Sequence, residues 1–167
     1  MLKILFFAIL ISFSLSQNLG QYTKRTKNCE VGDKNIKIRV EMITKSSKNN
    51  REKAEKIFTF VRDNIQYTYY RRSKYGAIRT LKNRAGNCCD QTHLLIALLR
   101  TAGIPSRYRY GDCYFVRAKQ VINHVWAEAN IDNKWITLDT TSSINVFGKA
   151  NNWSTAKNLN TCIELSF

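Results

Sequence analysis

The stretch GNCCDQTHLLIALLRTAGIP, residues 86–105, predicts one helix with a defined start and a defined end. Asn87 is a preferred N-cap residue, and Asp90, three positions later, suits the returning member of a capping box. Gly103 favours the left-handed backbone that ends many helices, and Pro105 cannot continue one. We therefore expect a helix that begins at residue 88 and ends just before Gly103.

This helix carries an unusual combination of residues along its length. Residues 94–99 are apolar nearly all round, so other elements should pack against it from several sides. Cys88 lies at its start, where unpaired backbone N–H groups and the positive end of the helix dipole favour a thiolate. Cys88 is therefore a candidate nucleophile. Cys89 stays an alternative, because adjacent helix positions point about 100° apart.

The length and the first residues predict one exported domain. A chain of 167 residues suits a single domain with a substantial core. Residues 1–16 read as a signal peptide, with Lys3 before an apolar run that falls short of the roughly 20 residues of a membrane-spanning helix. We expect a secreted or wall-associated protein without membrane insertion after cleavage, with residues 17–28 as a flexible leader and 29–167 as the single domain.

Five cysteines in an exported chain leave at least one thiol unpaired within the chain. Pairing of Cys89 with Cys113 and of Cys29 with Cys162 is compatible with the sequence, which does not determine the connectivity. The cysteines and histidines lack the usual spacing of zinc ligands. We expect no metal and no cofactor.

The formal charge of +15 and the pI of about 9.9 imply an acidic partner or surface. The basic residues are spread along the chain instead of gathering on one helix, as an element that reads a nucleic-acid groove would require. Together with the signal peptide, this favours an anionic wall or membrane surface over nucleic acid.

The remaining periodicities predict an α+β fold in which the central helix packs on an antiparallel sheet. An apolar stripe predicts a helix over residues 50–64, capped by Asn49 or Asn50. Three alternating segments predict strands. They are residues 106–116, 124–131 and 135–141, and we expect the last two to form a hairpin. Residues 66–72 should be extended, residues 78–82 should form a short helix, and the tail from residue 145 has weaker signals.

The chain has two histidines, so the search for a base is short. His93 lies five residues after Cys88 and points away from it on the helix, as a packed histidine would. His124 opens a predicted strand. If residues 132 and 133 form a two-residue turn, His124 opposes Thr141 and lies diagonal to Asp139 on the same side of the sheet.

Cys88, His124 and Asp139 would thus meet as nucleophile, base and orienting residue. Attack on a carbonyl would form a tetrahedral intermediate with an oxyanion, which the backbone N–H of Cys88 would help to bind. A second oxyanion donor is needed. The candidates are Asn87, Tyr69 and Tyr70.

Three motifs in this order resemble the core of the transglutaminase-like superfamily, which has a papain-like α+β fold. They are the segment from Gly86 to Arg107, the run His124-Val125-Trp126-Ala127-Glu128, and Trp135 with Asp139. The resemblance covers about residues 50–145, and its spacing back from Gly103 favours Cys88 over Cys89. Residues 88–94 and 123–126 look closer still to pseudomurein endoisopeptidases and related surface proteins of methanogenic archaea.

The resemblance implies a thiol hydrolase that cuts peptide or isopeptide bonds through an acyl-enzyme formed on Cys88, and we expect the protein to be a monomer. Its natural substrate would be the wall peptide of archaeal pseudomurein. The chain shows no wall-binding repeat, and its positive charge would partly replace one. Two alternatives remain open: a transglutaminase that passes the acyl group to an amine, and a non-catalytic wall-binding or adhesive module of the same fold.

Overall fold

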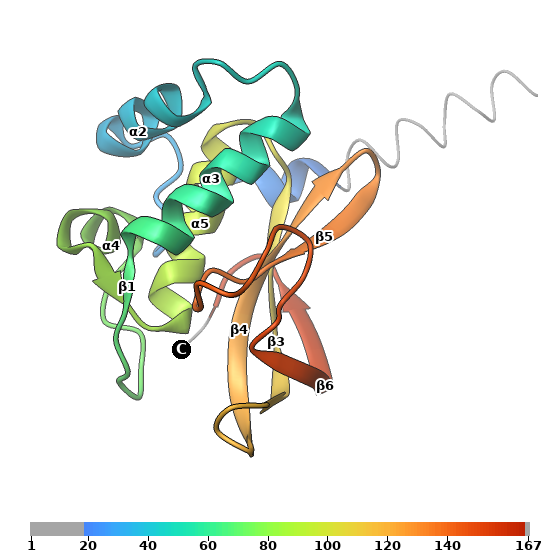
Figure 1. The fold of residues 1–167 in the computed structure, drawn as a ribbon. Helices are drawn as coiled ribbons and strands as arrows, with labels where there is room; N and C mark the ends of the chain where they lie inside the picture. The colour runs from blue at the N-terminus through green and yellow to red at the C-terminus, as the bar shows by residue number, and fades with distance from the viewer. Residues whose placement is uncertain (1–18, 166–167) are drawn as a thin grey trace, which may run out of the picture.

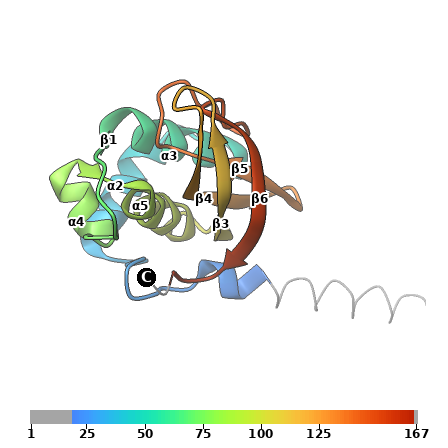
Figure 2. The same ribbon diagram turned by 90° about the horizontal axis from the view of Figure 1, so that it is seen from below.

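The computed structural model describes residues 19–165, so the predicted signal peptide lies outside the described residues. The helix α5 (Cys88–Thr101) runs through the centre of the fold, as expected. Other helices lie on one side of it and the four-stranded sheet on the other (Figures 1 and 2). Residues 89–100 of α5 are all buried, which confirms the prediction of a helix packed from several sides.

Both ends of α5 form as their residues predict. The Asn87 side-chain oxygen accepts a hydrogen bond from the Asp90 backbone N–H at 3.0 Å, which caps the first turn and stabilises such helices by about 1 kcal/mol. Gly103 has a φ of +80°. Ile104 N–H then donates to the Leu99 carbonyl at 2.9 Å and Gly103 N–H to the Arg100 carbonyl at 3.0 Å. This is the pattern of a Schellman motif.

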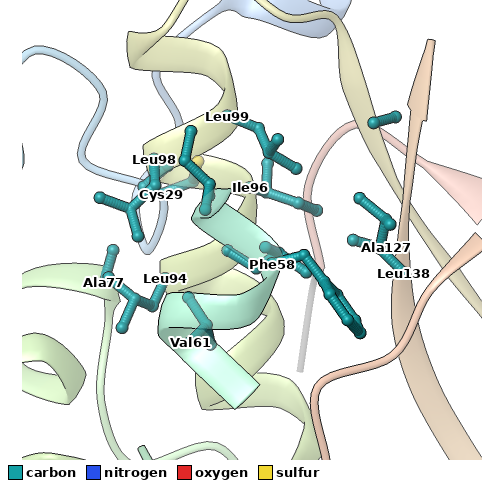
Figure 3. Close-up of a cluster of buried hydrophobic side chains, with 14 of the residues drawn as sticks. Cys29, Phe58, Val61, Ala77, Leu94, Ile96, Leu98, Leu99, Ala127 and Leu138 are labelled. Atoms are coloured by element: carbon teal, nitrogen blue, oxygen red, sulfur yellow. The ribbon is translucent and has the colours of Figure 1, made fainter. Parts of the chain in front are cut away.

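Three further helices pack around α5. They are α2 (Lys34–Thr44), α3 (Asn50–Asn64) and α4 (Ala77–Asn83). The predicted helix over residues 50–64 is confirmed as α3, and Asn49 is its cap, accepting from the Glu52 N–H at 2.9 Å. Figure 3 shows apolar side chains of α3 and α5 meeting those of the sheet, Phe58 and Ala127 among them. Burial of each large apolar side chain stabilises the fold by about 1.5–3 kcal/mol.

Four antiparallel strands form the main sheet in the order β5-β4-β3-β6. They are β3 (Ser106–Phe115), β4 (Gln120–Ile131), β5 (Lys134–Leu138) and β6 (Trp153–Cys162). The predicted two-residue turn joins β4 to β5, with positive φ angles at Asp132 and Asn133 that match a type I′ turn. The α+β prediction is confirmed. β6 was not predicted, because its polar residues give no clear alternation.

A second, two-stranded sheet lies beside the start of α5. Here β1 (Gln66–Tyr67) pairs in parallel with β2 (Ala85–Gly86), so the extended segment is shorter than the predicted residues 66–72. Tyr67 is paired with Gly86 in this ladder, and Thr68 N–H donates to the Gly86 carbonyl at 3.0 Å. The pairing fixes Tyr67 next to the turn that leads into Cys88.

Residues 17–28 were expected to form a flexible leader, but the described part of this segment, residues 19–28, packs against the domain. The Tyr22 ring packs edge-on against Trp135 with centroids 5.1 Å apart. Lys24 offers its carbonyl to the Arg100 guanidinium at 2.7 Å, and Lys27 N–H donates to Glu164 at 2.8 Å. Arg100 is a buried cation that also donates to backbone carbonyls elsewhere. It thereby ties residues 19–28 to the domain.

Within residues 19–165, none of the helices is long and apolar enough to cross a membrane.

Candidate active site

The structure brings the three predicted residues of the triad together. Cys88 is the first residue of α5, His124 lies in β4, and Asp139 directly follows β5. His124 Nε2 lies 3.0 Å from Asp139 Oδ2. Because Nε2 is hydrogen-bonded to Asp139, Nδ1 is the ring nitrogen left for the hydrogen bond between His124 and the Cys88 sulfur. The imidazole therefore lies between a thiol and a carboxylate.

Asp139 is held by several donors although it is almost fully buried. Its Oδ1 accepts from the Thr141 backbone N–H at 3.0 Å and from the Thr141 hydroxyl at 2.7 Å. Its Oδ2 accepts from Trp153 Nε1 at 2.8 Å. Burial alone would raise the pKa of this carboxyl, but His124 and the two hydrogen bonds from Thr141 lower it to about 2. Asp139 is thus a fixed negative charge.

The strand carrying Asp139 is shorter than predicted. The β4–β5 ladder ends at the pair Ala127 and Leu138, so Asp139 and Thr141 lie beyond it and Thr141 does not oppose His124 in the ladder. The cause is the turn that Thr141 forms by donating to the Asp139 carboxylate. This turn aims the carboxylate at the imidazole, whereas continued pairing would only have placed it diagonally.

Aromatic rings surround His124. The Trp126 ring stacks on the imidazole with centroids 6.1 Å apart, and the Phe115 ring meets it edge-on at 5.1 Å. Burial opposes a charge on the imidazole, but the Asp139 carboxylate and the interaction with Cys88 raise the pKa of His124 to about 10. The ring is therefore an imidazolium at neutral pH.

The Cys88 thiol is acidified by its neighbours. A hydrogen bond from the Cys89 thiol lowers its pKa most; burial opposes this, and His124 and the Val125 backbone N–H lower it further, to about 5. Cys88 and His124 thus form a thiolate–imidazolium pair at neutral pH, because each charge stabilises the other. A thiolate at neutral pH is the nucleophilic form of cysteine.

We expect iodoacetamide to alkylate Cys88 ahead of the other four cysteines at pH 6–7. Only the thiolate reacts, and its population rises as the pH rises through the pKa of about 5. Burial raises the pKa of Cys29 to about 11 and that of Cys113 to about 12, and it also raises that of Cys162. Peptide mapping by mass spectrometry after short labelling checks this order. First labelling at another cysteine would contradict it.

Cys89 has the opposite character to its neighbour. It is buried, and the hydrogen bond to Cys88, together with burial, raises its pKa. The structure therefore favours Cys88 over Cys89 as the thiolate and gives Cys89 the place of a donor to it. All five cysteines are free thiols, so neither compatible pairing, Cys89 with Cys113 or Cys29 with Cys162, is formed in the structure.

A cleft of about 1060 Å³ opens over Cys88. One wall is the loop between β1 and α4, and the other comes from the ends of β3 and β4 with the hairpin between them. Both project from the same side of the molecule (Figure 1). Cys88 and His124 both line the cleft, as do Tyr67 and Thr141. An extended chain laid in this cleft would pass the thiolate.

Asn87 and Tyr70, two of the expected oxyanion donors, give their side-chain hydrogens to other acceptors in this structure. The Asn87 amide nitrogen donates to the Tyr70 and Arg72 carbonyls, each at 3.2 Å. The Tyr70 hydroxyl donates to the Asp90 carboxylate and accepts from the Asn87 N–H. Tyr69 lines the cleft, but its side chain is 80 % exposed, so it is not held against Cys88. The Cys88 N–H remains, because the first N–H groups of a helix have no acceptor within it.

Asp90 does not complete the expected capping box. Its buried carboxylate turns instead to the loop after β1, where it accepts from Ser73 Oγ at 2.6 Å and from the Tyr75 N–H at 2.9 Å, as well as from Tyr70. The Asn87 N–H, which a capping box would satisfy, goes to the Tyr70 hydroxyl. The first turn of α5 therefore holds the loop between β1 and α4, which forms one wall of the cleft.

Tyr67 is a cleft residue that sequence reasoning missed. It lines the same cleft as Cys88 and is 43 % exposed, and partial burial together with the Cys88 charge raises the pKa of its phenol to about 12. Its phenol therefore stays protonated and able to donate. The parallel pairing of Tyr67 with Gly86 places it there, and a two-residue ladder leaves no periodic signal in a sequence.

His93 is a packed residue, as expected. It is buried, its Nδ1 lies 2.8 Å from the Tyr108 hydroxyl, and burial lowers its pKa to about 4. His93 is buried against β3 and is not among the described residues that line the cleft. In the part of the chain that the structure describes, no group of three or more His, Cys, Asp or Glu side chains is placed to hold a metal ion.

Comparison with solved structures shows the same fold in bacterial proteins. A candidate cysteine protease from Cytophaga hutchinsonii is 22 % identical over 90 % of this chain and 57 % of its own, with a TM-score of 0.66. The periplasmic domain of TgpA from Pseudomonas aeruginosa is 15 % identical over 75 % of this chain and 47 % of its own, with a TM-score of 0.59. A candidate protease from Parabacteroides distasonis is 18 % identical over 77 % of this chain and 26 % of its own, with a TM-score of 0.55.

These similarities show the fold, and this chain spans little more than half, or less, of each of these proteins. None of the curated proteins matches the sequence. The model of the transglutaminase-like superfamily matches residues 38–140, which include Cys88, His124 and Asp139. The chain therefore belongs to the transglutaminase-like superfamily.

Proposed function

We propose that this protein is a cysteine hydrolase that cuts peptide or isopeptide bonds with Cys88, His124 and Asp139. The observation that carries the proposal is the buried contact of His124 with Asp139 at 3.0 Å, with the acidified Cys88 thiol on the other side of the ring. An open cleft gives a substrate access to this group. A buried histidine with a purely structural role would not need a thiolate beside it.

The first half of the reaction makes an acyl-enzyme. The Cys88 thiolate attacks the scissile carbonyl carbon, and the carbonyl oxygen becomes an oxyanion that the Cys88 N–H and the Tyr67 phenol bind. When the tetrahedral adduct collapses, the C–N bond breaks and His124 Nδ1 gives its proton to the leaving amine. A thioester on Cys88 remains, and Asp139 keeps the ring oriented through Nε2.

The second half releases the acid. Neutral His124 takes a proton from water at Nδ1, and the resulting hydroxide attacks the thioester carbonyl. The C–S bond then breaks, the carboxylic acid leaves, and the thiolate–imidazolium pair is restored. If an amine replaces water in this step, the product is a new amide, which is the transglutaminase alternative.

Tyr67→Phe is expected to lower kcat by about a hundredfold with little change in KM, because the phenol donates only to the oxyanion of the transition state. The ring and its position in the cleft remain. Steady-state kinetics on a peptide substrate measure the effect. The matched control is Tyr69→Phe, which removes a hydroxyl from the exposed wall of the same cleft and should change kcat less than threefold. Equal effects of the two changes would remove Tyr67 from the mechanism.

Hydrolysis and acyl transfer are separated by offering both acceptors. The protein is incubated with a glutamine-containing peptide and an excess of a free primary amine, and the products are identified by mass spectrometry. The proposal expects hydrolysed peptide with the amine left unincorporated. Amine-linked product without hydrolysis would establish the transglutaminase alternative. Absence of either product, together with an unreactive Cys88, would favour the non-catalytic module.

For the substrate, we propose a wall peptide reached after export, with archaeal pseudomurein as the specific case. The charge of +15 supports retention at an anionic surface, and the N-terminal residues 1–16 have the pattern of a signal peptide. Isolated pseudomurein and bacterial peptidoglycan are the paired test substrates, with Cys88→Ala as the blank. New amino groups released only from pseudomurein would support the assignment, and release only from peptidoglycan would overturn it.

A further inference from the structure

One wall of the cleft carries two free cations that the mechanism does not use. Arg71 and Arg72 lie in the loop between β1 and α4 and line the cleft over Cys88. Both are exposed, and in the described chain neither guanidinium takes part in an ion pair or a hydrogen bond. By contrast, the neighbouring Lys74 ammonium lies over the Tyr70 ring, 4.4 Å from its centroid.

The cleft has one negative charge in its described lining, the Cys88 thiolate, which is paired with the His124 imidazolium. Its described lining includes no Asp or Glu side chain. Three carboxylates next to the lining are already bound by other groups. Asp90 is fully buried and bound to the loop, Asp139 is bound to His124 and Trp153, and Asp112 accepts from Asn123 and Asn158. The cleft therefore presents a positive wall to whatever enters it.

The backbone beneath the two arginines is fixed relative to the nucleophile. The Arg72 carbonyl accepts from the Asn87 side chain, and Ser73 and Tyr75 donate to Asp90. Asn87 and Asp90 flank Cys88 in the first turn of α5, so the loop and the sulfur are held by the same rigid element. The backbone of the two arginines is therefore held close to the sulfur, while their unpaired guanidinium groups stay available to a substrate.

We propose that Arg71 and Arg72 select substrates with a carboxylate close to the bond that is cut, so that this site prefers acidic peptides. Guanidinium groups bind carboxylates through paired hydrogen bonds, which gives both attraction and geometry. As a statement about substrate preference, this inference rests on the proposed function, because a preference requires that the protein cuts peptides. It also makes a prediction about binding alone, which does not require turnover.

The test measures how well short peptides protect Cys88 from iodoacetamide. Three blocked tripeptides are compared, identical except for a central Glu, Gln or Lys. The Glu peptide should bind about tenfold more tightly than the Gln peptide, as expected for two partly exposed charge pairs, and the Lys peptide should bind least. Raising the salt concentration should reduce this difference, because it screens exposed charges. Equal protection by the three peptides would overturn the proposal.

Three double variants locate the effect. R71Q/R72Q should bring the Glu peptide to within about twofold of the Gln peptide, and R71E/R72E should make the Lys peptide the best of the three. The matched control K34Q/K37Q removes two equally exposed charges from α2, outside the cleft lining, and should keep the wild-type order. Loss of the preference in K34Q/K37Q would show an effect of net charge and would also overturn the proposal.

Hydrolysis of the same peptides is followed in parallel, so that failure of the two proposals can be told apart. Protection that depends on Arg71 and Arg72 without any cleavage would support the carboxylate-binding wall and contradict the hydrolase. Cleavage at equal kcat/KM for the three peptides would support the hydrolase and contradict the wall. Selective cleavage of the Glu peptide, lost in R71Q/R72Q, would support both.

Discussion

Cys88→Ala is expected to reduce peptide hydrolysis by at least about 10⁴-fold, because it removes the atom that forms the acyl-enzyme. The structure supports this size of effect, since the Cys88 thiol is the one cysteine whose pKa lies below neutral pH, at about 5. The cavity left by the change is small and partly open to the cleft, so the protein should stay folded. Hydrolysis rates and circular dichroism of the purified variant check both statements.

Cys89→Ala is the matched control, because it removes the same atom from the adjacent residue. We expect it to keep most of the activity at pH 8 and to shift the pH midpoint of Cys88 alkylation upward. The sign follows from the hydrogen bond: Cys89 stabilises the Cys88 thiolate, so its removal raises the pKa of Cys88 and less thiolate remains at low pH. If Cys89→Ala abolishes activity at every pH while Cys88→Ala keeps it, the assignment of the nucleophile is reversed.

His124→Ala is expected to reduce kcat by about 10³- to 10⁴-fold, since the proton for the leaving amine then has no donor. A second readout does not depend on substrate. The His124 imidazolium lowers the pKa of Cys88, so without it the pH midpoint of iodoacetamide labelling should move upward from about 5. A purely structural histidine would leave this midpoint in place.

His93→Asn provides the comparison, because His93 is the other histidine of the chain. Its ring meets the Tyr108 hydroxyl in the core. Loss of this contact should lower the free energy of unfolding by about 1–3 kcal/mol and leave kcat of the folded protein nearly unchanged. Urea unfolding and kinetics below the unfolding range measure the two effects. A large loss of kcat in folded His93→Asn, with His124→Ala still active, would show that His93 is the base and that the assignment to His124 is wrong.

The predictions from sequence succeeded where a local rule acts on neighbouring residues. Asn87 caps α5, Gly103 and Ile104 end it with short-range hydrogen bonds, and two residues with positive φ form the turn between β4 and β5. This turn sets the register of the hairpin and so brings His124 and Asp139 to the same side of the sheet.

They failed where residues distant in sequence compete for the same group. Asp90 has the spacing of a capping box, but donors from Ser73 and Tyr75 take its carboxylate. The Tyr70 hydroxyl donates its hydrogen to that same carboxylate, so Tyr70 has no hydrogen left for an oxyanion. Trp153 reaches Asp139 from the edge strand β6, whose polar residues carry no clear periodic signal.

By itself, the sequence determined the central helix, the thiol at its start and the order of nucleophile, base and carboxylate along the chain, because caps, turns and periodicity depend on near neighbours. Only the tertiary structure decided which of two adjacent thiols is acidified, that Tyr67 and not Tyr70 has a free phenol beside Cys88, and that Arg71 and Arg72 line the cleft. The physical reason is that a pKa, a free donor and an unpaired charge depend on every group packed nearby.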